Sequence, residues 1–273
     1  MSESGPPDTT EFRIQVKTTG PGQGVLEWDL AASADVLAEA VSAVSDDALL
    51  GQGFRRLEVS LPASDRLGRR AVQRAGFRLE GVRRQVHPTG ADPSGQDTFD
   101  DVAIYARLVG DVTRGPSAFS SVMNSVLPRK RLIAHVIIRD DADRFVLCET
   151  AFKPDWELPG GIVEPAESAR QGAVREVREE LGVDLAPGPV LVADWLPPYL
   201  GWEDATEMIF DGGRVTEADV GRFDLDRHEI RAARLVTLDE AESLVTPLSH
   251  RRLSVALSLA PGEFAYLEDG RRV

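Results

Sequence analysis

The chain has 273 residues, which is enough for one large or two ordinary domains. Its apolar fraction of 42% is that of a globular protein, and no apolar run reaches the ~18 residues that a membrane-spanning helix needs. The formal net charge of −14 argues against non-specific nucleic-acid binding, and it makes a polyanionic substrate hard to hold without a metal ion. The single cysteine, Cys148, excludes an intramolecular disulfide; its apolar neighbours predict a buried thiol, which fits a reducing cytoplasm.

The first half of the chain predicts an α/β domain over residues 11–110, after a polar tail at 1–10 that we expect to be disordered. Ser33 is a plausible N-cap for one helix, and Gly76 is placed to end another. Residues 88–96 contain Pro, Gly, Asp and Ser and predict a loop. The expected strands are 11–17, 25–30, 55–61, 77–86 and 98–108, and the expected helices are 34–50 and 64–75.

A second domain is expected over residues 129–273, and residues 111–128 are expected to form a linker before it. The fold class that these elements predict is α+β. The expected strands of the second half are 131–139, 144–150, 189–196, 206–211 and 231–237, and the expected helices are 167–181, 238–244 and 248–258.

Three glutamates share one face of the helix that we expect from Glu167 onward. Positions three and four apart lie together on a helix, so Glu176, Glu179 and Glu180 project together, and Gly182 is placed to end the helix. Three carboxylates within ~6 Å of each other repel strongly. A sequence therefore keeps such a cluster either on a solvated surface or around a hard cation such as Mg²⁺.

The residues around this helix follow the spacing Gly-x5-Glu-x7-Arg-Glu-aliphatic-x-Glu-Glu-x-Gly-aliphatic. A chance match to this pattern has a frequency on the order of 10⁻⁸ per starting position. The spacing is the signature of the Nudix hydrolases, and residues 129–260 resemble that family. The preceding Trp156-Glu-Leu-Pro-Gly-Gly161 resembles the family's usual approach to this box, whereas Ala166 stands at a position that is commonly glycine. The fixed positions are Gly161, Glu167, Arg175, Glu176, Glu179, Glu180 and Gly182.

The resemblance implies an α/β/α sandwich that hydrolyses a pyrophosphate bond in a nucleoside diphosphate linked to another moiety. It implies that Mg²⁺ or Mn²⁺ is bound by Glu176, Glu179 and Glu180, with the Gly160 carbonyl as a further ligand. It also implies that Glu167 and Arg175 pair to brace the helix. Metal ions in such sites polarise phosphoryl oxygens and activate water.

The general base and the substrate contacts are less sharply indicated. Glu180 and Glu229 are the two candidates for the base, while Glu179 counts as catalytic through its metal-ligand role; His228 is more typical of a loop histidine. Aromatic side chains can stack a nucleobase, although such residues more often pack in cores or loops. Arg251 and Arg252 are candidates for phosphate contacts but fit a helix surface better. The candidate aromatic substrate contacts are Trp195, Tyr199 and Trp202.

The first half resembles a truncated GNAT-type acyl-CoA N-acyltransferase domain over residues 11–110. Gly76, Phe77, Glu80 and Gly81 fit that family's Gly-Phe-x-x-Glu-Gly motif. The family binds the pyrophosphate of coenzyme A at a glycine-containing turn that opens a helix, but residues 30–36 contain no glycine and include Asp35. We therefore expect a degenerate domain that docks on the hydrolase half, mediates homodimerisation or shapes the substrate entrance, and these alternatives stay open.

The sequence thus predicts a cytoplasmic Nudix-type pyrophosphohydrolase with a nucleotide-type substrate and no membrane or non-specific nucleic-acid partner. One alternative is a non-catalytic nucleotide-binding sensor, against which the full set of three glutamates argues. Another is a bifunctional acetyltransferase and hydrolase, against which the missing glycine turn argues.

Overall fold

A computed structural model describes residues 13–28 and 33–273 of the chain. The chain divides into two compact units, residues 1–128 and 129–273. The expected tail at 1–10 lies outside the described residues. Among the described residues, no helix is long and apolar enough to cross a membrane.

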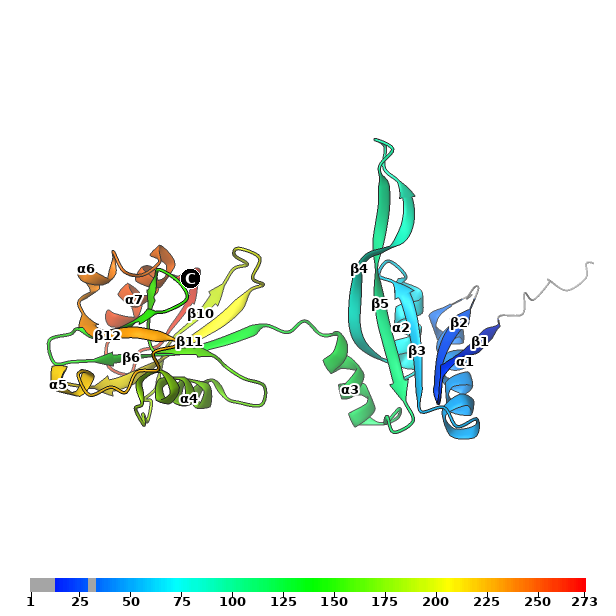
Figure 1. The fold of residues 1–273 in the computed structure, drawn as a ribbon, viewed down its shortest axis with the longest axis horizontal. Coiled ribbons are helices and arrows are strands. Elements are labelled where there is room, and N and C mark those ends of the chain that lie inside the picture. Colours follow the sequence, from blue (N-terminus) through cyan, green and yellow to red (C-terminus); the bar gives the residue numbers. More distant parts are fainter. Residues whose placement is uncertain (1–12, 29–32) are drawn as a thin grey trace, which may run out of the picture. The chain divides into compact units, whose positions relative to one another are not determined.

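The first unit contains a five-stranded sheet with two helices packed against each other (Figure 1). The strand order is β1-β2-β3-β5-β4. The expected helix 34–50 ends its α-helical part at Asp46 and continues as a π-helical turn, η1. The elements are β1 (Ile14–Gly20), β2 (Gln23–Trp28), α1 (Ala34–Asp46), η1 (Asp47–Gly51), β3 (Arg56–Pro62), α2 (Arg66–Arg74), β4 (Arg78–Ala91) and β5 (Asp97–Leu108).

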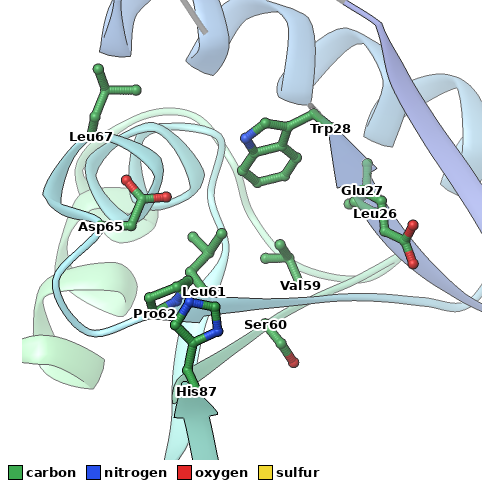
Figure 2. A pocket seen from close by; sticks show the side chains of 10 residues that line it. All are labelled: Leu26, Glu27, Trp28, Val59, Ser60, Leu61, Pro62, Asp65, Leu67 and His87. Carbon is green, nitrogen blue, oxygen red and sulfur yellow. The ribbon is translucent and has the colours of Figure 1, made fainter. Parts of the chain in front are cut away.

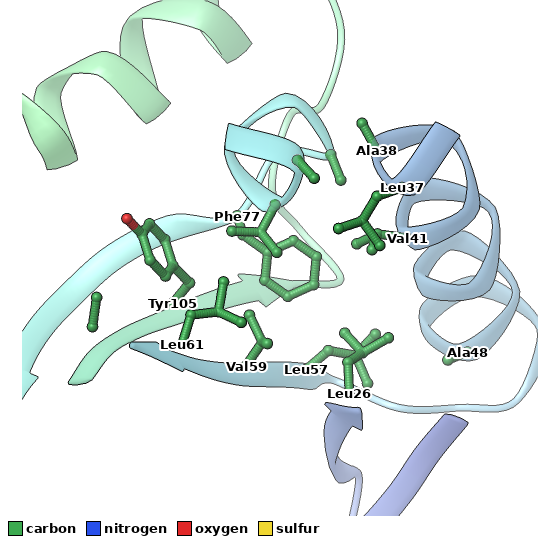
Figure 3. Close-up of a cluster of buried hydrophobic side chains, with 14 of the residues drawn as sticks. Leu26, Leu37, Ala38, Val41, Ala48, Leu57, Val59, Leu61, Phe77 and Tyr105 are labelled. Atoms are coloured by element: carbon green, nitrogen blue, oxygen red, sulfur yellow. The ribbon is translucent and has the colours of Figure 1, made fainter. Parts of the chain in front are cut away.

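The core of this unit lies between the sheet and helices α1 and α2 (Figure 3). Leu37 and Val41 come from the apolar face of α1, and both are fully buried. They meet Leu57 of β3 and Phe77, the residue that follows the turn at Gly76. Gly76 has a φ of +86°, a conformation that favours glycine, so it can end α2 and return the chain to the sheet.

Strands β2 and β3 are parallel but pair over a short stretch only. Their register runs from Gln23 opposite Arg56 to Val25 opposite Glu58. Beyond that point the two strands diverge: β2 continues to Trp28 and β3 to Pro62 without further pairing with each other. The divergence opens the first unit's sheet between these two strands.

Strands β4 and β5 form a long hairpin that extends beyond the rest of the sheet (Figure 1). The expected loop at 88–96 is too long, because β4 continues to Ala91 and β5 begins at Asp97. The Asp92 carboxylate closes the short turn by accepting from the backbone N–H groups of Ser94 at 2.8 Å and Gln96 at 3.0 Å. β4 is an edge strand, and its register with β5 shifts at three places.

Residues 111–128, which we expect to be a linker, contain helix α3 (Pro116–Val126). Ala118 and Val122 of this helix are buried, and the Ser125 hydroxyl accepts from the Leu79 N–H at 3.0 Å. The segment is therefore packed against β4 of the first unit. The helix is short and is flanked by polar residues and glycine, which is why the sequence predicts a linker.

The second unit is built on a nine-stranded mixed sheet. The main path has the order β12-β7-β6-β11-β10-β13-β14, with β8 paired to β7 and β9 paired to β6. The strands β8, β9, β13 and β14 are not among those expected from the sequence. The elements are β6 (Arg131–Arg139), β7 (Phe145–Thr150), β8 (Trp156–Glu157), β9 (Gly160–Ile162), α4 (Ala169–Leu181), β10 (Val190–Leu196), β11 (Ala205–Arg214), α5 (Glu217–Val220), β12 (Ile230–Val236), α6 (Leu238–Ala241), α7 (Pro247–Leu257), β13 (Ala265–Glu268) and β14 (Arg271–Arg272).

Both faces of this sheet are apolar and covered by helices. Val136 and Ile138 of β6 pack in one core cluster with residues of α4, whereas the intervening Ile137 packs in the other with residues of α6 and α7. Successive strand residues point to opposite faces, so an apolar run such as 136–138 belongs in a sheet that is buried on both sides. The mixed α/β architecture agrees with the expected class.

Helix α4 begins two residues later than expected. Ser168 is its N-cap and forms a capping box with Gln171, so the first helical residue is Ala169. Gly182 ends the helix in the left-handed conformation. Ala166, just before the cap, has a φ of +71°, which places an alanine where glycine is the easier residue.

Candidate functional site

Two glutamates of α4 lie against the two glycines of β9. The Gly160 N–H donates to Oε2 of Glu180 at 2.9 Å. A Cβ on Gly161 would meet the Glu176 carboxyl carbon at 2.8 Å and its two oxygens at 3.0 Å. A side chain at either glycine would also be strained or crowded, since Gly160 has a φ of +131° and its Cβ would lie 2.2 Å from the Ala134 carbonyl oxygen. The glycines therefore allow the carboxylates to approach the backbone.

Burial strongly affects the Glu180 carboxylate. Glu180 is only 8% exposed, and this burial raises its pKa to about 7, although the Gly160 N–H and the charge of His135 act in the opposite direction. Burial also raises the pKa of Glu176, with the Arg175 guanidinium opposing it and the charges of Glu179 and Glu229 adding to it. The site thus holds carboxylates in a place where negative charge is costly.

The Arg175 guanidinium binds three carboxylates around the start and the acidic face of α4. It forms a two-point ion pair with Glu167, with Nε to Oε1 at 2.8 Å and a second nitrogen to Oε2 at 3.2 Å. It also contacts Glu176 at 3.0 Å and Glu179 at 2.9 Å. Arg175 therefore joins the loop before α4 to the acidic face of the helix.

The three expected metal ligands have different surroundings. Glu180 is buried at Gly160, Glu176 is half-buried at Gly161, and the Glu179 side chain is 57% exposed beside Arg175. Within residues 13–28 and 33–273, no group of three or more His, Cys, Asp or Glu side chains converges in a way that could hold a metal ion. Glu176 and Glu179 bind the same nitrogen of the Arg175 guanidinium, whereas Glu180 accepts the Gly160 N–H instead.

Glu229 and His228 lie in the loop that precedes β12. The Glu229 carbonyl accepts from the Ala151 N–H at 2.6 Å, and its exposed side chain is near enough to Glu176 for its charge to contribute to the raised pKa there. His228 is exposed, and its backbone N–H donates to Asp226. The structure thus places Glu229 near the acidic cluster. It shows no comparable proximity for His228.

The expected aromatic contacts lie on the hairpin between β10 and β11. Trp195 donates from its indole nitrogen to Asp204 at 3.1 Å. Tyr199 and Trp202 pair through an isolated bridge and are 71% and 59% exposed, and the Arg131 guanidinium lies 4.4 Å from the Trp202 ring centre. The hairpin brings these three aromatic residues together. Their contacts with Asp204, Arg131 and each other do not join them to the glutamates of α4.

The expectation for Arg252 is wrong. Arg252 is buried rather than on a helix surface, and it forms ion pairs with Asp194 and Glu207. Burial would raise the pKa of Glu207, but Arg252 and His135 outweigh it and hold that pKa at about 2. Arg251, in contrast, is half-buried and binds Asp269 at 3.1 Å. Asp194 and Glu207 are charged residues in strands that are otherwise largely apolar, and this pattern is the sequence feature that could have predicted the buried cluster.

A separate hollow lies in the first unit, where β2 and β3 diverge (Figure 2). Its volume is about 690 Å³, which is in the range of small-molecule sites. Its walls are mainly apolar, and the ten lining residues include two carboxylates but no lysine or arginine. The lining residues are Leu26, Glu27, Trp28, Val59, Ser60, Leu61, Pro62, Asp65, Leu67 and His87.

Comparison with known proteins identifies the second unit. The family model of the NUDIX domain matches residues 129–256. An asymmetrical bis(5'-nucleosyl)-tetraphosphatase of Sus scrofa is 34% identical over 120 residues, which cover 42% of this chain and 78% of that protein. The chain belongs to the Nudix family.

Other similarities are more partial. A CTP pyrophosphohydrolase of Escherichia coli is 43% identical over 61 residues, which cover 21% of this chain and 44% of that protein. The chain therefore spans less than half the length of that relative, and it spans 36% of a relative from Bacillus subtilis. The crystal structure of a MutT protein from Methanosarcina mazei Go1 is 26% identical and covers 44% of this chain and 88% of its own, with a TM-score of 0.38.

Replacing Glu180 by glutamine is expected to stabilise the protein at alkaline pH in EDTA. The folded-state pKa of Glu180, about 7, lies above the ordinary 4.5. The contribution of the protonated Glu180 carboxyl to the free energy of unfolding is therefore fully present below pH 4.5 and is lost as the pH rises through 7. Glu180→Gln should therefore gain on the order of 3 kcal/mol at pH 8 and little at pH 4.5. Urea denaturation at both values measures this difference. Exposed Glu179→Gln is the control, and a Glu180→Gln protein that is less stable than wild type at pH 8 would contradict the expectation.

Proposed function

We propose that this chain hydrolyses a pyrophosphate bond in a nucleoside diphosphate linked to another moiety, with Mg²⁺ or Mn²⁺ held at the acidic face of α4. The observation that carries the proposal is the buried Glu180 carboxylate at the Gly160 peptide, with Glu176 beside it at Gly161. Membership of the Nudix family supports the reaction type. The names of the two relatives, a CTP pyrophosphohydrolase and a bis(5'-nucleosyl)-tetraphosphatase, support a substrate with linked phosphates.

The residues present fit a hard divalent cation in the chemistry of their donor atoms. Carboxylate and carbonyl oxygens are the ligands that Mg²⁺ prefers, and Glu176, Glu179, Glu180 and the Gly160 carbonyl would supply them. A buried carboxylate whose pKa is raised to about 7 gains from a nearby positive charge. When bound, the cation polarises phosphoryl oxygens and lowers the pKa of water.

The residues of the site would then have three roles: positioning the helix, binding the cation and accepting a proton. Glu167, in the loop before α4, pairs with Arg175 in the middle of the helix and so fixes the direction of the acidic face. Glu180 is buried and already accepts the Gly160 N–H, which suits a ligand better than a base that must reach solvent. Glu229 is exposed and lies within the electrostatic reach of Glu176, so it is the better-placed residue to take a proton from the attacking water.

Glu179→Gln should lower kcat at least ~100-fold while leaving the fold intact, because a ligand of the cation contributes several kcal/mol to charge stabilisation. A phosphate-release screen across nucleoside diphosphate derivatives with Mg²⁺ measures this loss. Glu242→Gln, which changes an exposed glutamate of the same unit, is the matched control and should keep wild-type turnover. Equal turnover in Glu179→Gln and wild type would count against the ligand assignment, and binding without turnover in wild type would favour a nucleotide sensor.

Replacing Glu229 by glutamine should distinguish the role of general base from the role of cation ligand. If Glu229 accepts the proton, its replacement lowers kcat by 10²–10⁴-fold, the usual contribution of a general base, and leaves the Mn²⁺ affinity unchanged. Glu180→Gln should instead weaken Mn²⁺ binding as well. Both quantities can be measured on the same preparations, by steady-state kinetics and by the electron paramagnetic resonance signal of free Mn²⁺. Unchanged kcat in Glu229→Gln would return the role of base to Glu180.

For the first unit we propose a degenerate acyltransferase-like domain that does not transfer acyl groups. The Asp35 carboxylate lies in the first turn of α1 and pairs with Arg74, so a negative charge stands where a phosphate would need positive potential. The hollow between β2 and β3 adds Glu27 and Asp65, and its lining residues include no lysine or arginine. Both features disfavour an anionic cofactor.

Acetyl-CoA should therefore give no saturable heat at micromolar concentrations when titrated into the full chain. Isothermal titration calorimetry tests this directly, and a titration of the same protein with Mn²⁺ controls for correct folding. Saturable micromolar binding of acetyl-CoA would instead support a bifunctional acetyltransferase and hydrolase.

A further inference from the structure

Four ionisable side chains form a buried cluster in the second unit. His135, Glu207 and Asp194 come from β6, β11 and β10, which are neighbours in the sheet, and Arg252 comes from α7. They expose little of their surface: Asp194 0%, Glu207 3%, Arg252 5% and His135 7%.

The four side chains bind one another in a linear chain. Arg252 donates from Nε to Oδ2 of Asp194 at 2.8 Å and contacts Oε1 of Glu207. The same Glu207 oxygen lies 2.9 Å from Nδ1 of His135. At the far end, the Gly270 N–H donates to Oδ1 of Asp194 at 3.1 Å. The cluster therefore runs from the turn between β13 and β14 to His135.

Stability alone is a weak reason for this cluster. Asp194 and Glu207 stand directly opposite each other in β10 and β11, a position in which like charges repel. Their neighbours on the same face, Val192 and Ile209, are apolar core residues. Replacing a buried ion pair by apolar residues of similar volume is often neutral or stabilising. The charges must therefore contribute something that apolar packing would not.

The chain ends at the peptide that holds Glu180. His135 is the β6 partner of Gly160, and a Cβ on Gly160 would lie 2.9 Å from Cδ2 of the His135 ring. The His135 ring therefore fills the space in which a side chain at Gly160 would stand. The N–H of the same glycine donates to Glu180 at 2.9 Å, so the ring packs beside the peptide that holds this glutamate.

We infer that Asp194, Arg252, Glu207 and His135 are positioning residues for the divalent-cation site, in which the ion-pair chain fixes the His135 ring against Gly160 and so holds the Gly160 peptide at Glu180. This inference rests on the proposed function, because it assigns the four residues a role behind the proposed ligands Glu180 and Gly160. Residues that orient metal ligands from behind typically change metal affinity by 10–100-fold when they are replaced.

The test is the affinity of the full chain for Mn²⁺, measured by electron paramagnetic resonance without substrate. Glu207→Gln keeps the shape of the side chain but removes the charge that joins Arg252 to His135. It should weaken Mn²⁺ binding ~10-fold or more. Asp140→Asn is the matched control, because Asp140 is also a buried carboxylate of this unit, 6% exposed, but it closes the turn after β6 by accepting from the Ala142 and Arg144 N–H groups. It should lose stability without losing Mn²⁺ affinity.

Asp194→Asn repeats the test from the far end of the chain and replaces Glu207→Gln if that variant does not fold. A weaker affinity in each of these two variants that folds, with Asp140→Asn at wild-type affinity, supports the inference. Wild-type affinity in folded Glu207→Gln or in folded Asp194→Asn overturns it, and so does an equal loss in Asp140→Asn. Glu180→Gln separates this result from a failure of the proposed function: if it loses affinity while Glu207→Gln does not, only the positioning role falls. A wild-type chain that binds no Mn²⁺ overturns both.

Discussion

The contact between the Glu180 carboxylate and the Gly160 peptide is the constraint on which the rest of the site depends. It forms because β9 presents two glycines to α4, and because Gly160 adopts a conformation that other residues rarely adopt. The same absence of side chains lets Glu176 reach Gly161. The capping box at Ser168 and the ion pair of Glu167 with Arg175 set the start of the helix. Local backbone geometry thus determines where negative charge gathers in this unit.

Much of this arrangement could be predicted from the sequence, because it is encoded by local spacing. The apolar run from Arg131 to Arg139 predicts β6 with the bounds that the structure has. Glycine at position 182 predicts the end of α4, since a left-handed residue is needed there. The burial of Cys148 also follows from its apolar neighbours, and the thiol is 1% exposed. The roles of the glutamates in binding and catalysis stay predictions.

Features that depend on distant parts of the chain were not predictable. The cluster of Asp194, Glu207 and Arg252 joins two strands and a helix, and no spacing rule brings residues 194 and 252 together. Strand β13 pairs with β10 across 70 or so residues of sequence, and its four residues carry a weak pattern. Helix α3 is short and begins at Pro116 after the N-cap Gly115, so its flanks resemble a linker. In each case, tertiary packing decides what local propensity leaves open.

The long β4–β5 hairpin has a consequence for the behaviour of the protein at high concentration. Its outer strand would offer a template for open-ended strand addition if it were flat and regular. The register shifts between Leu79 and Gly81, between Arg83 and His87, and between Pro88 and Gly90 interrupt that template, and Pro88 has no N–H to donate. Intermolecular β-aggregation along this edge is thereby disfavoured, although the strand is 14 residues long.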